Sequence, residues 1–341
     1  MATLQGVLIG CGWISTNQLK AWATIPDVEI IALVDMDGSK ARTRAREFGV
    51  ANTYTSLDEA LSAHELDFVD IATRPETHLQ LVTQAAEAGL AVLCQKPAAP
   101  TMNEIREMVD ICTARNVPLT INENGRFQPW FRAMKRHLES GAIGRPFYLN
   151  ITSRWRASLP EPNFGGQPYF IDMPLLMIYE MGVHFLDTLR YLTGESTRLY
   201  AQTHCANPDL AGEDMATLML QGEGLTSVVD MSWASVPVDE GISWGEFKIE
   251  GKLGTLHLGL DGILRVIGDK GVTSEESFPD DSVFLGFCGA QQHFVDSLKS
   301  DEASETSGIE TLKTMELVFG AYESASTGSA YQIGKDIGRL K

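Results

Sequence analysis

Residues 6–15, GVLIGCGWIS, decide the fold of this chain. A short apolar run ends on a glycine, and the helical pattern that follows has an apolar stripe of Ile14, Leu19 and Trp22. A G-x-G-x-x-[small] turn between a strand and a helix is typical of dinucleotide binding. The first glycine makes the tight turn, and the second lets a pyrophosphate approach free backbone amides at the positive end of the helix. We therefore predict dinucleotide contacts from Gly10, Cys11, Gly12, Trp13, Ile14 and Ser15, against the alternative of an ordinary glycine turn.

The next strand supplies an acid at the position where such folds hold the adenosine ribose. VEIIALVD spans residues 28–35, and Asp35 ends this strand 23 residues after Gly12. A carboxylate there accepts hydrogen bonds from the ribose hydroxyls and repels the 2′-phosphate of NADP. We predict NAD as the cofactor, with NADP the less favoured alternative because Lys40 and Arg42 lie nearby.

Strands and helices alternate through the first third of the chain. Further strands are predicted at FVDIAT (68–73), AVLCQ (91–95) and PLTIN (118–122). The helices between them are predicted at residues 39–48, after the capping box Ser56–Glu59, at residues 77–88, and after the capping box Thr101–Glu104. This alternation predicts a doubly wound parallel sheet, the Rossmann fold, in a domain of residues 1–123.

From residue 124 onward the pattern changes to runs of strands. They are predicted at residues 147–156, 199–205, 216–222, 225–233, 247–258 and 263–268, with helices at 129–140, 286–298 and 308–326, the last opened by the capping box Ser307–Glu310. Runs of strands with few helices between them predict a large open, mostly antiparallel sheet. The fold class is therefore α/β, with an N-terminal Rossmann domain and a C-terminal α+β domain of residues 124–341.

Composition and charge exclude several classes of protein. The chain has 341 residues, 44% of them hydrophobic, and 27 basic against 45 acidic side chains give a net charge of −18. An acidic globular chain of this kind repels nucleic acid and anionic lipid, so we expect neither as a partner. No apolar run is long enough to span a membrane, and the N-terminus has no signal-peptide pattern. Five cysteines at long spacings indicate reduced thiols and a cytoplasmic protein with no zinc site.

Two loops follow the third and fourth strands at the edge of the sheet where ligands bind. The first carries Thr73, Arg74 and Pro75, with His78 opening the next helix. The second carries Gln95 and Lys96, and the lysine would point a cation into the ligand crevice. We predict cofactor contacts from these residues. The alternatives are an ordinary helix N-terminus for His78 and a solvated surface lysine for Lys96.

A possible general base lies in the helical stretch that ends near Gly194. Glu180 and His184 are four residues apart and so share a helix face. Gly182 between them weakens a helix by about 1 kcal/mol, which favours a close approach to the backbone there. A histidine beside a carboxylate is a natural proton acceptor. The alternatives are a buried core histidine and a metal pair, and no further ligands cluster nearby to support a metal.

The substrate is expected beside the strand that ends in Arg154-Trp155-Arg156. The loop 157–173 is rich in proline, glycine and aromatic residues, and a loop of this length without regular structure is usually functional. We predict that Trp155, Arg156 and Tyr169 contact the substrate or the nicotinamide. A loop packed at an oligomer interface is the alternative.

Several motifs together resemble the glucose–fructose oxidoreductase / inositol dehydrogenase / MocA-like oxidoreductases, over essentially the whole chain. They are VLIGCGWIS, ALVD ending at Asp35, QKPAA around Lys96, ENGRFQPW (123–130), SGAIGRP (140–146), EMGVHFLDTLRYLTG (180–194), IEGKLGTLHL (249–258) and LKTMELVFGAYESASTGS (312–329).

The resemblance implies a Rossmann domain followed by an open sheet that often forms an oligomer interface, here a homodimer or homotetramer. It implies oxidation or reduction of sugars and polyols with NAD or NADP, with Lys96 and His184 as the paired catalytic residues and Arg126 of the ENGRFQPW motif among the cofactor contacts. Two positions depart from the family pattern: Gln95 replaces the usual glutamate, and Glu180 replaces the usual aspartate. The second change reshapes the polyol pocket.

We therefore expect an NAD-dependent dehydrogenase that oxidises the anomeric carbon of an aldose to a lactone, with pentoses such as apiose as candidates. His184 would accept the hydroxyl proton, Lys96 would stabilise the charge on the oxygen, and Glu180 would orient His184 or a neighbouring hydroxyl. The alternatives are oxidation of a ring secondary alcohol to a ketone, a glycosidase that retains NAD, and a non-catalytic NAD-binding sensor.

Overall fold

The computed structural model describes residues 3–237, 244–300 and 302–334, and it divides into two compact units. The N-terminal unit comprises residues up to Phe127 together with Val283–Lys313. The C-terminal unit comprises Gln128–Ser282 together with the residues from Thr314 onward. The strand and helix pattern does not indicate that residues 283–313 return to the first unit. A functional division between residues 123 and 124 stays a prediction.

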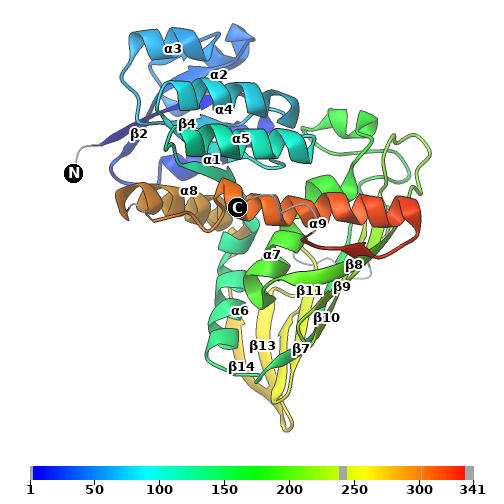
Figure 1. The fold of residues 1–341 in the computed structure, drawn as a ribbon. Coiled ribbons are helices and arrows are strands. Elements are labelled where there is room, and N and C mark those ends of the chain that lie inside the picture. The colour runs from blue at the N-terminus through cyan, green and yellow to red at the C-terminus, as the bar shows by residue number, and fades with distance from the viewer. Residues whose placement is uncertain (1–2, 238–243, 301, 335–341) are drawn as a thin grey trace. The chain divides into compact units, whose positions relative to one another are not determined.

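The N-terminal unit is built on a six-stranded parallel sheet in the order β3-β2-β1-β4-β5-β6 (Figure 1). Its strands are β1 (Leu4–Ile9), β2 (Val28–Val34), β3 (Asn52–Tyr54), β4 (Phe68–Ile71), β5 (Ala91–Gln95) and β6 (Leu119–Asn122). Its helices are α1 (Trp13–Trp22), α2 (Gly38–Phe48), α3 (Leu57–Ala63), α4 (His78–Glu87), α5 (Met102–Ala114) and α8 (Ser282–Ser300), with short 3-10 turns η1 (Pro75–Thr77) and η2 (Gly125–Phe127). The predicted Rossmann sheet is confirmed, and the short strand β3 was missed.

Aromatic packing joins α8 to the sheet although the two are far apart in sequence. Phe68 of β4 contacts Trp22 of α1, with ring centroids 5.0 Å apart, and Phe294 of α8 at 5.6 Å. Gln291 of α8 donates a hydrogen bond to the backbone oxygen of Gln18 in α1, at 3.2 Å. Helix α8 therefore completes one face of the parallel sheet.

Capping residues define where several helices begin, as the sequence predicts. Ser56 Oγ accepts from the amide of Glu59 at 3.3 Å, and Thr101 Oγ1 accepts from the amide of Glu104 at 3.2 Å. Ser307 Oγ does the same for Glu310 at 3.4 Å, at the start of α9 (Gly308–Thr327). The N-cap hydrogen bond of each of the three predicted capping boxes is confirmed.

The C-terminal unit is built on a nine-stranded sheet in the order β14-β13-β12-β11-β7-β10-β9-β8-β15. Its strands are β7 (Pro146–Arg154), β8 (Ser196–His204), β9 (Met215–Gly222), β10 (Leu225–Ser232), β11 (Glu246–Gly251), β12 (Gly254–Leu258), β13 (Ile263–Gly268), β14 (Gly271–Ser277) and β15 (Tyr331–Gln332). Its helical elements are α6 (Pro129–Glu139), η3 (Pro168–Asp172), η4 (Ile178–Gly182), α7 (Val183–Thr193) and the later part of α9. The pair β7 and β10 is parallel and the other pairs are antiparallel, so the prediction of a large, mostly antiparallel sheet is confirmed.

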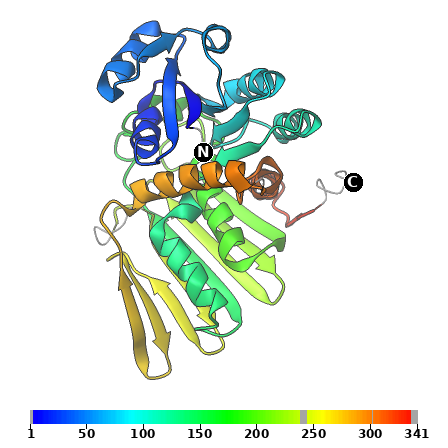
Figure 2. The same ribbon diagram turned by 90° about the vertical axis from the view of Figure 1, so that its left-hand side faces the viewer.

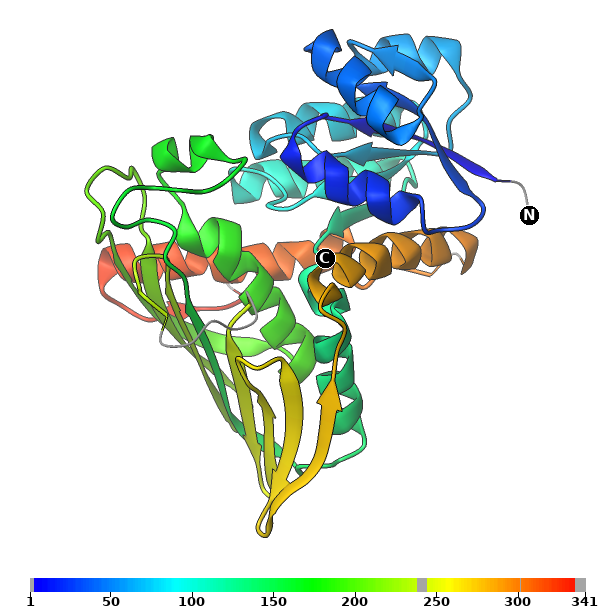
Figure 3. The ribbon, with the colours of Figure 1, turned by 180° about the vertical axis from the view of Figure 1, so that it is seen from behind.

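Helices α6 and α7 lie against one face of this sheet (Figures 2 and 3). Phe247 of β11 contacts Phe131 of α6, with ring centroids 4.6 Å apart, and Phe185 of α7 at 5.8 Å. Among the described residues, no helix covers the opposite face in either view. Alternate side chains of β7 and β9 are buried on the helix side, as expected for a sheet with one covered face.

The prediction of one strand-like stretch over residues 247–258 is wrong, because the chain turns back at residues 251–254 to form the hairpin of β11 and β12. Glycines at both ends of this turn lie against neighbouring backbone: a Cβ at Gly251 would sit 2.3 Å from the oxygen of Ile143, and one at Gly254 would sit 2.4 Å from that of Ile267.

In the part of the chain that the structure describes, no helix is long and apolar enough to cross a membrane.

A carboxyl group is buried in the middle of the parallel sheet. Asp70 of β4 has no exposed surface, and it accepts hydrogen bonds from Gln18 Nε2 at 3.0 Å and from Trp22 Nε1 at 2.7 Å. Burial raises the pKa of Asp70 to about 7, and the hydrogen bond from Trp22 opposes that rise. Gln18 Oε1 has no partner. An amide flip at Gln18 would therefore let its Oε1 accept a hydrogen bond from the protonated carboxyl of Asp70.

Asp70 should make the N-terminal unit less stable as the pH rises from about 4 to about 7. Across this window the unfolded chain has lost the proton that the folded carboxyl keeps, so the free energy of unfolding should fall by up to roughly 4 kcal/mol. Asp70→Asn should flatten the pH dependence of the free energy of unfolding, because the new side chain does not titrate. After an amide flip, Gln18 can still form a hydrogen bond with it. Urea unfolding measured across this pH range tests it, with Asp58→Asn on exposed α3 as the control. Equal pH dependence in wild type and Asp70→Asn would contradict the expectation.

Candidate active site

The turn after β1 is shaped by a glycine that no other residue could replace. Gly10 has φ +97°, and a Cβ on it would lie 2.7 Å from the backbone oxygen of Ala72 at the end of β4. Its amide donates to the oxygen of Val34 at 2.8 Å, which holds the turn against β2. The turn therefore lies at the carboxyl ends of three adjacent strands, β2, β1 and β4.

The first turn of α1 offers backbone amides to a ligand. Gly12 is the residue before the helix, and no side chain caps it. Ser15 Oγ donates to the oxygen of Gly12 at 2.7 Å, and a Cβ on Gly12 would meet nothing within 4 Å. Trp13 is 55% exposed, while Ile14 packs against the core. Uncapped amides beside open space at a helix N-terminus fit the pyrophosphate of a dinucleotide.

Asp35 links this turn to the one that follows β2. Its Oδ2 accepts from the amide of Cys11 at 2.8 Å, and its Oδ1 accepts from the amide of Asp37 at 2.9 Å. The two hydrogen bonds fix the carboxylate beside the turn at Gly10–Gly12, just after the end of the second strand. This is the position from which an acid holds the adenosine ribose.

Two further groups shape the turn at Gly10–Gly12. Cys11 is buried, and burial raises the pKa of its thiol to about 12, with a smaller effect from Asp35, so the thiol stays protonated. Arg44 of α2 donates to the oxygen of Gly12 at 3.0 Å. We did not predict a role for Arg44, because its position on a polar helix gives no sequence signal that it reaches across to the turn.

The loop after β4 is held to the loop after β5 by a buried histidine. His78 has no exposed surface, and its ring nitrogens lie 3.0 Å from the oxygen of Ala98 and 3.2 Å from that of Thr73. Burial lowers the pKa of His78, against the effect of these hydrogen bonds. Pro75 is buried and Arg74 is exposed. The observed contacts give His78 a structural task, and its predicted contact with the cofactor stays a prediction.

Lys96 follows β5 at the carboxyl edge of the sheet. Its backbone amide donates to Oε1 of the buried Gln95 at 2.7 Å. Arg126, in the turn after β6, is 6% exposed and donates to the backbone oxygen of Glu305 at 3.0 Å. Both residues lie just beyond the ends of their strands, and their contacts with a cofactor stay predictions.

In the C-terminal unit, His184 lies in the first turn of α7 with its ring against an indole. The ring centroids of His184 and Trp244 are 4.8 Å apart, and both side chains are at least nine-tenths buried. Sequence reasoning missed Trp244, because it lies 60 positions further along the chain than the histidine.

Glu180 precedes α7 in a π-helical turn, Ile178–Gly182, and is 5% exposed. The sequence predicts an ordinary helix here, and the structure departs from it at this turn. Gly182 packs against the sheet: a Cβ on it would lie 3.2 Å from Cε of Met231 in β10. Turns of the π type are frequent at functional sites.

The predicted substrate residues lie in the same unit. The amide of Trp155 donates to the oxygen of Ser232 at 2.8 Å, and the exposed Arg156 donates through Nη1 to the oxygen of Ala234 at 2.7 Å. Tyr169 in η3 accepts a hydrogen bond from Gln167 at 3.0 Å. The segment after β7 is thus joined to the segment after β10, and substrate contacts stay predictions.

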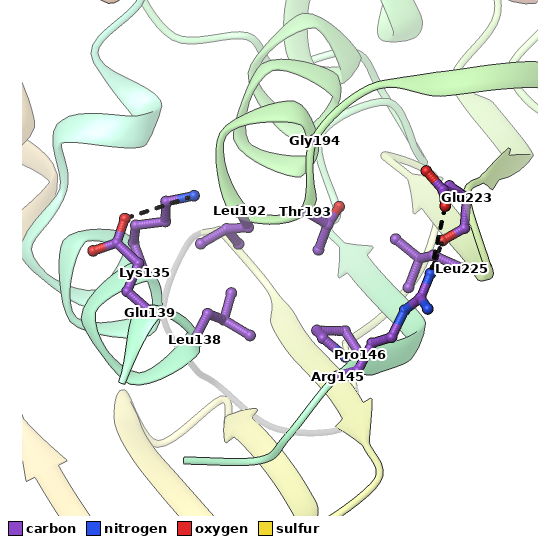
Figure 4. Close-up of a pocket in the computed structure, with 10 residues that line it drawn as sticks. All are labelled: Lys135, Leu138, Glu139, Arg145, Pro146, Leu192, Thr193, Gly194, Glu223 and Leu225. Atoms are coloured by element: carbon purple, nitrogen blue, oxygen red, sulfur yellow. Dashed lines mark hydrogen bonds and ion pairs between the residues drawn. The ribbon is translucent and has the colours of Figure 1, made fainter. Parts of the chain in front are cut away.

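A separate pocket of about 450 Å³ opens beside the C-terminal ends of α6 and α7 (Figure 4). Its charges are paired, Lys135 with Glu139 and Arg145 with Glu223, each at 3.9 Å. None of the predicted site residues lines it. In the described part of the chain, no group of three or more histidine, cysteine or acidic side chains is placed to hold a metal ion.

The N-terminal unit therefore brings the glycine turn, Asp35, the Thr73 loop and Lys96 to one edge of a parallel sheet. This arrangement defines an NAD-binding oxidoreductase of the Rossmann type. A family model described as "Oxidoreductase family, NAD-binding Rossmann fold" matches residues 4–123, and the "GFO/IDH/MocA C-terminal domain" matches residues 131–257. The chain belongs to the Gfo/Idh/MocA oxidoreductase family.

Similar proteins cover nearly the whole chain. A D-apiose dehydrogenase of Paraburkholderia graminis is 38% identical, over 96% of this chain and 89% of its own length. A D-apiose dehydrogenase of Rhizobium rhizogenes is 35% identical, over 98% and 99%. The solved structure of an oxidoreductase from Agrobacterium radiobacter in complex with NAD+, L-tartaric acid and magnesium is 35% identical with a TM-score of 0.91, over 98% and 99%.

Asp35→Asn should shift the cofactor preference toward NADP. The substitution removes the charge that repels a 2′-phosphate but keeps an oxygen for the amide of Cys11, so the affinity for NADP relative to NAD should rise about tenfold or more. Calorimetric titration with both cofactors measures the ratio. Asp37→Asn is the matched control, because Asp37 caps α2 through the amide of Ser39 at 2.9 Å. An unchanged ratio in Asp35→Asn would remove Asp35 from cofactor selection.

Proposed function

We propose that this chain is an NAD-dependent sugar dehydrogenase that oxidises the anomeric carbon of a cyclic aldose to a lactone, with a branched pentose such as D-apiose as the first candidate. The observation that carries this proposal is the match, over nearly full length, to two proteins named D-apiose dehydrogenase. The complete set of dinucleotide-binding features in the N-terminal unit supports it.

His184 is the proposed general base. It takes the proton of the anomeric hydroxyl on a ring nitrogen as the carbon is oxidised. The indole of Trp244 against one side of the ring restricts its orientation. When bound, NAD accepts the hydride from the same carbon.

Lys96 is the proposed electrostatic partner. An ammonium that donates a hydrogen bond to the reacting oxygen stabilises the negative charge that develops as its proton leaves. The buried carboxamide of Gln95 holds the backbone of Lys96 at the end of β5. Glu180 orients the base or a neighbouring hydroxyl of the sugar.

The sugar ring is proposed to lie against the segment after β7. Trp155 and Tyr169 offer aromatic faces on which a sugar ring can stack, and Arg156 can donate hydrogen bonds to hydroxyl groups. The segment is anchored at its start, because Ser158 Oγ donates to Oδ2 of the buried Asp214 at 2.7 Å.

We also propose that the uncovered face of the nine-stranded sheet binds a second copy of the chain, as a homodimer or within a homotetramer. This face carries Met219 of β9, which is 53% exposed, and, three strands away on β11, the ion pair of Lys248 with Glu250 at 2.7 Å. A cytoplasmic location is proposed because all five cysteines are free thiols.

A panel of aldoses, inositols and alkyl glycosides tests the substrate class. With NAD, we expect D-apiose and other aldoses to give NADH, and the product to react as a lactone, because an ester carbonyl forms when an anomeric alcohol is oxidised. NADH formation and product identity are followed by absorbance and carbon NMR. NADH from inositols alone would indicate oxidation of a secondary alcohol. Glycoside cleavage without NADH would contradict the proposal, as would NAD binding with no turnover.

Lys96→Met and His184→Asn should each lower kcat by about a hundredfold or more, because they remove the charge-stabilising donor and the proton acceptor. Calorimetry should show that both variants still bind NAD. Lys40→Met on α2 and His137→Asn on α6 are the matched controls, and their kcat should stay within about twofold. A variant at Lys96 or His184 that keeps full turnover would remove that residue from the mechanism.

A further inference from the structure

The helix that carries Glu180 and His184 begins with four amides that its own backbone cannot satisfy. The first hydrogen bond within the helix runs from the amide of Glu180 to the oxygen of Leu176, at 2.8 Å. The amides of residues 176–179 come before it and need other acceptors. These residues are buried away from water, so an amide without a hydrogen-bond acceptor there would lower the stability of the fold.

Two side chains from distant parts of the chain meet this need. Glu213 Oε2 accepts from the amide of Leu176 at 3.2 Å, and its Oε1 accepts from that of Ile178 at 2.9 Å. The backbone oxygen of Glu213 accepts from the amide of Met177 at 3.3 Å.

The fourth amide is paired with α9. The hydroxyl of Tyr322 accepts from the amide of Tyr179 at 3.1 Å and donates to Oε1 of Glu213 at 2.5 Å. All four leading amides are therefore paired with Glu213 or Tyr322, and the two side chains are paired with each other. Figure 1 shows α7 beside α9. The hydrogen bond from the amide of Tyr179 places Tyr322 of α9 at the start of the helical segment.

Glu213 is itself held in place on both sides. A Cβ on Gly212 would lie 2.5 Å from the oxygen of Met173, so the chain before Glu213 packs closely against the start of the helical segment. Asp214 accepts from Ser158 Oγ and from the amide of Ala206, both at 2.7 Å. The same short segment thus holds the start of the His184 helix and the start of the loop proposed to bind substrate.

The cap is a buried carboxyl group with several hydrogen-bond donors. Glu213 is 8% exposed, and burial raises its pKa while the hydroxyl of Tyr322 and the backbone amides act in the opposite direction. Three donors, one hydroxyl and two amides, fix the two oxygens of Glu213 in place, because each hydrogen bond constrains the direction of its acceptor.

We propose that Glu213 and Tyr322 are positioning residues for the dehydrogenase reaction, and that they set the π turn and, through it, the places of Glu180 and His184. This inference rests on the proposed function for its kinetic consequences. The π turn begins at Ile178, inside the capped stretch, so loss of an acceptor lets the turn rearrange to recover a partner for its amide. Because a displacement of about 1 Å in an active site can cost about a hundredfold in rate, the cap acts on kcat without touching substrate.

Glu213→Gln and Tyr322→Phe are the test variants. The glutamine places an amide donor where the carboxylate accepted, and the phenylalanine removes one hydroxyl with little change in shape. If Glu213→Gln does not fold, Tyr322→Phe carries the test alone.

Glu316→Gln is the matched control. Glu316 is also a buried glutamate of this unit, 1% exposed, and its Oε1 accepts from the hydroxyl of Tyr331 at 3.3 Å and from the amide of Gly334 at 2.8 Å. Neither of these two partners belongs to the His184 helix. Glu316→Gln therefore reports the cost of altering a buried glutamate that has a tyrosine partner.

The kinetic measurement uses the best aldose of the panel, with and without deuterium at the anomeric carbon. Glu213→Gln and Tyr322→Phe should lower kcat by about ten- to a hundredfold and raise the deuterium isotope effect on kcat, because the chemical step becomes slower than product release. NAD affinity should stay unchanged. Glu316→Gln should lower the melting temperature and keep kcat. A lowered melting temperature with unchanged kcat and isotope effect in both cap variants would overturn the proposal.

A second measurement does not depend on turnover. The Trp244 ring current displaces the NMR resonance of the His184 Cε1 proton, which can be assigned from the His184→Asn spectrum of ¹³C-histidine-labelled protein. This resonance should move in Glu213→Gln and Tyr322→Phe and stay in place in Glu316→Gln. An unmoved resonance in both cap variants would overturn the proposal. A wild-type protein that oxidises no sugar would contradict the proposed function alone, and the NMR comparison would still decide on the cap.

Discussion

The nucleotide-binding half of this protein depends on the close approach of Gly10 to the end of β4. The backbone there is left-handed, with φ +97°, and the carbonyl of Ala72 occupies the space of a side chain. This contact turns the chain sharply out of β1, so that α1 starts over the edge of the sheet with its first amides uncapped. The bond from the amide of Cys11 to Asp35 then ties the acid of β2 to the same turn. The turn proposed to bind phosphate and the acid proposed to bind ribose are thus positioned by one backbone constraint and one hydrogen bond.

The C-terminal half solves a different problem, which is to hold a buried histidine on a helix that starts irregularly. A π turn leads into α7, and Trp244 packs against the imidazole. The amides at the start of the helix are satisfied from outside it, by Glu213 and Tyr322. Several buried contacts hold the imidazole in place before any substrate binds. Such pre-organisation favours the role proposed for His184, which is to accept a proton from one atom of a sugar.

The sequence predicts the parallel sheet well, because its strands are short apolar runs separated by glycine turns and capping boxes, and these local signals agree with one another. It predicts less about the second half. The turn at Gly251–Gly254 splits an apolar stretch that reads as one strand, and β14 is a polar edge strand with no apolar pattern. The site follows the same division: the glycine turn and Asp35 have a characteristic spacing, whereas Arg44, Trp244 and Glu213 act across distances in sequence at which no spacing rule applies. The π turn was missed because its residues also fit an ordinary helix.

The central claim is that Lys96 and His184 act on the same oxygen of a sugar. A crystal structure of the enzyme with NADH and the lactone product tests it most directly. The account predicts the Lys96 ammonium and a ring nitrogen of His184 both within about 3.2 Å of the lactone carbonyl oxygen, the limit for a strong hydrogen bond. A lactone bound with either side chain directed away from that oxygen, or a carbonyl carbon turned away from the nicotinamide, would contradict it.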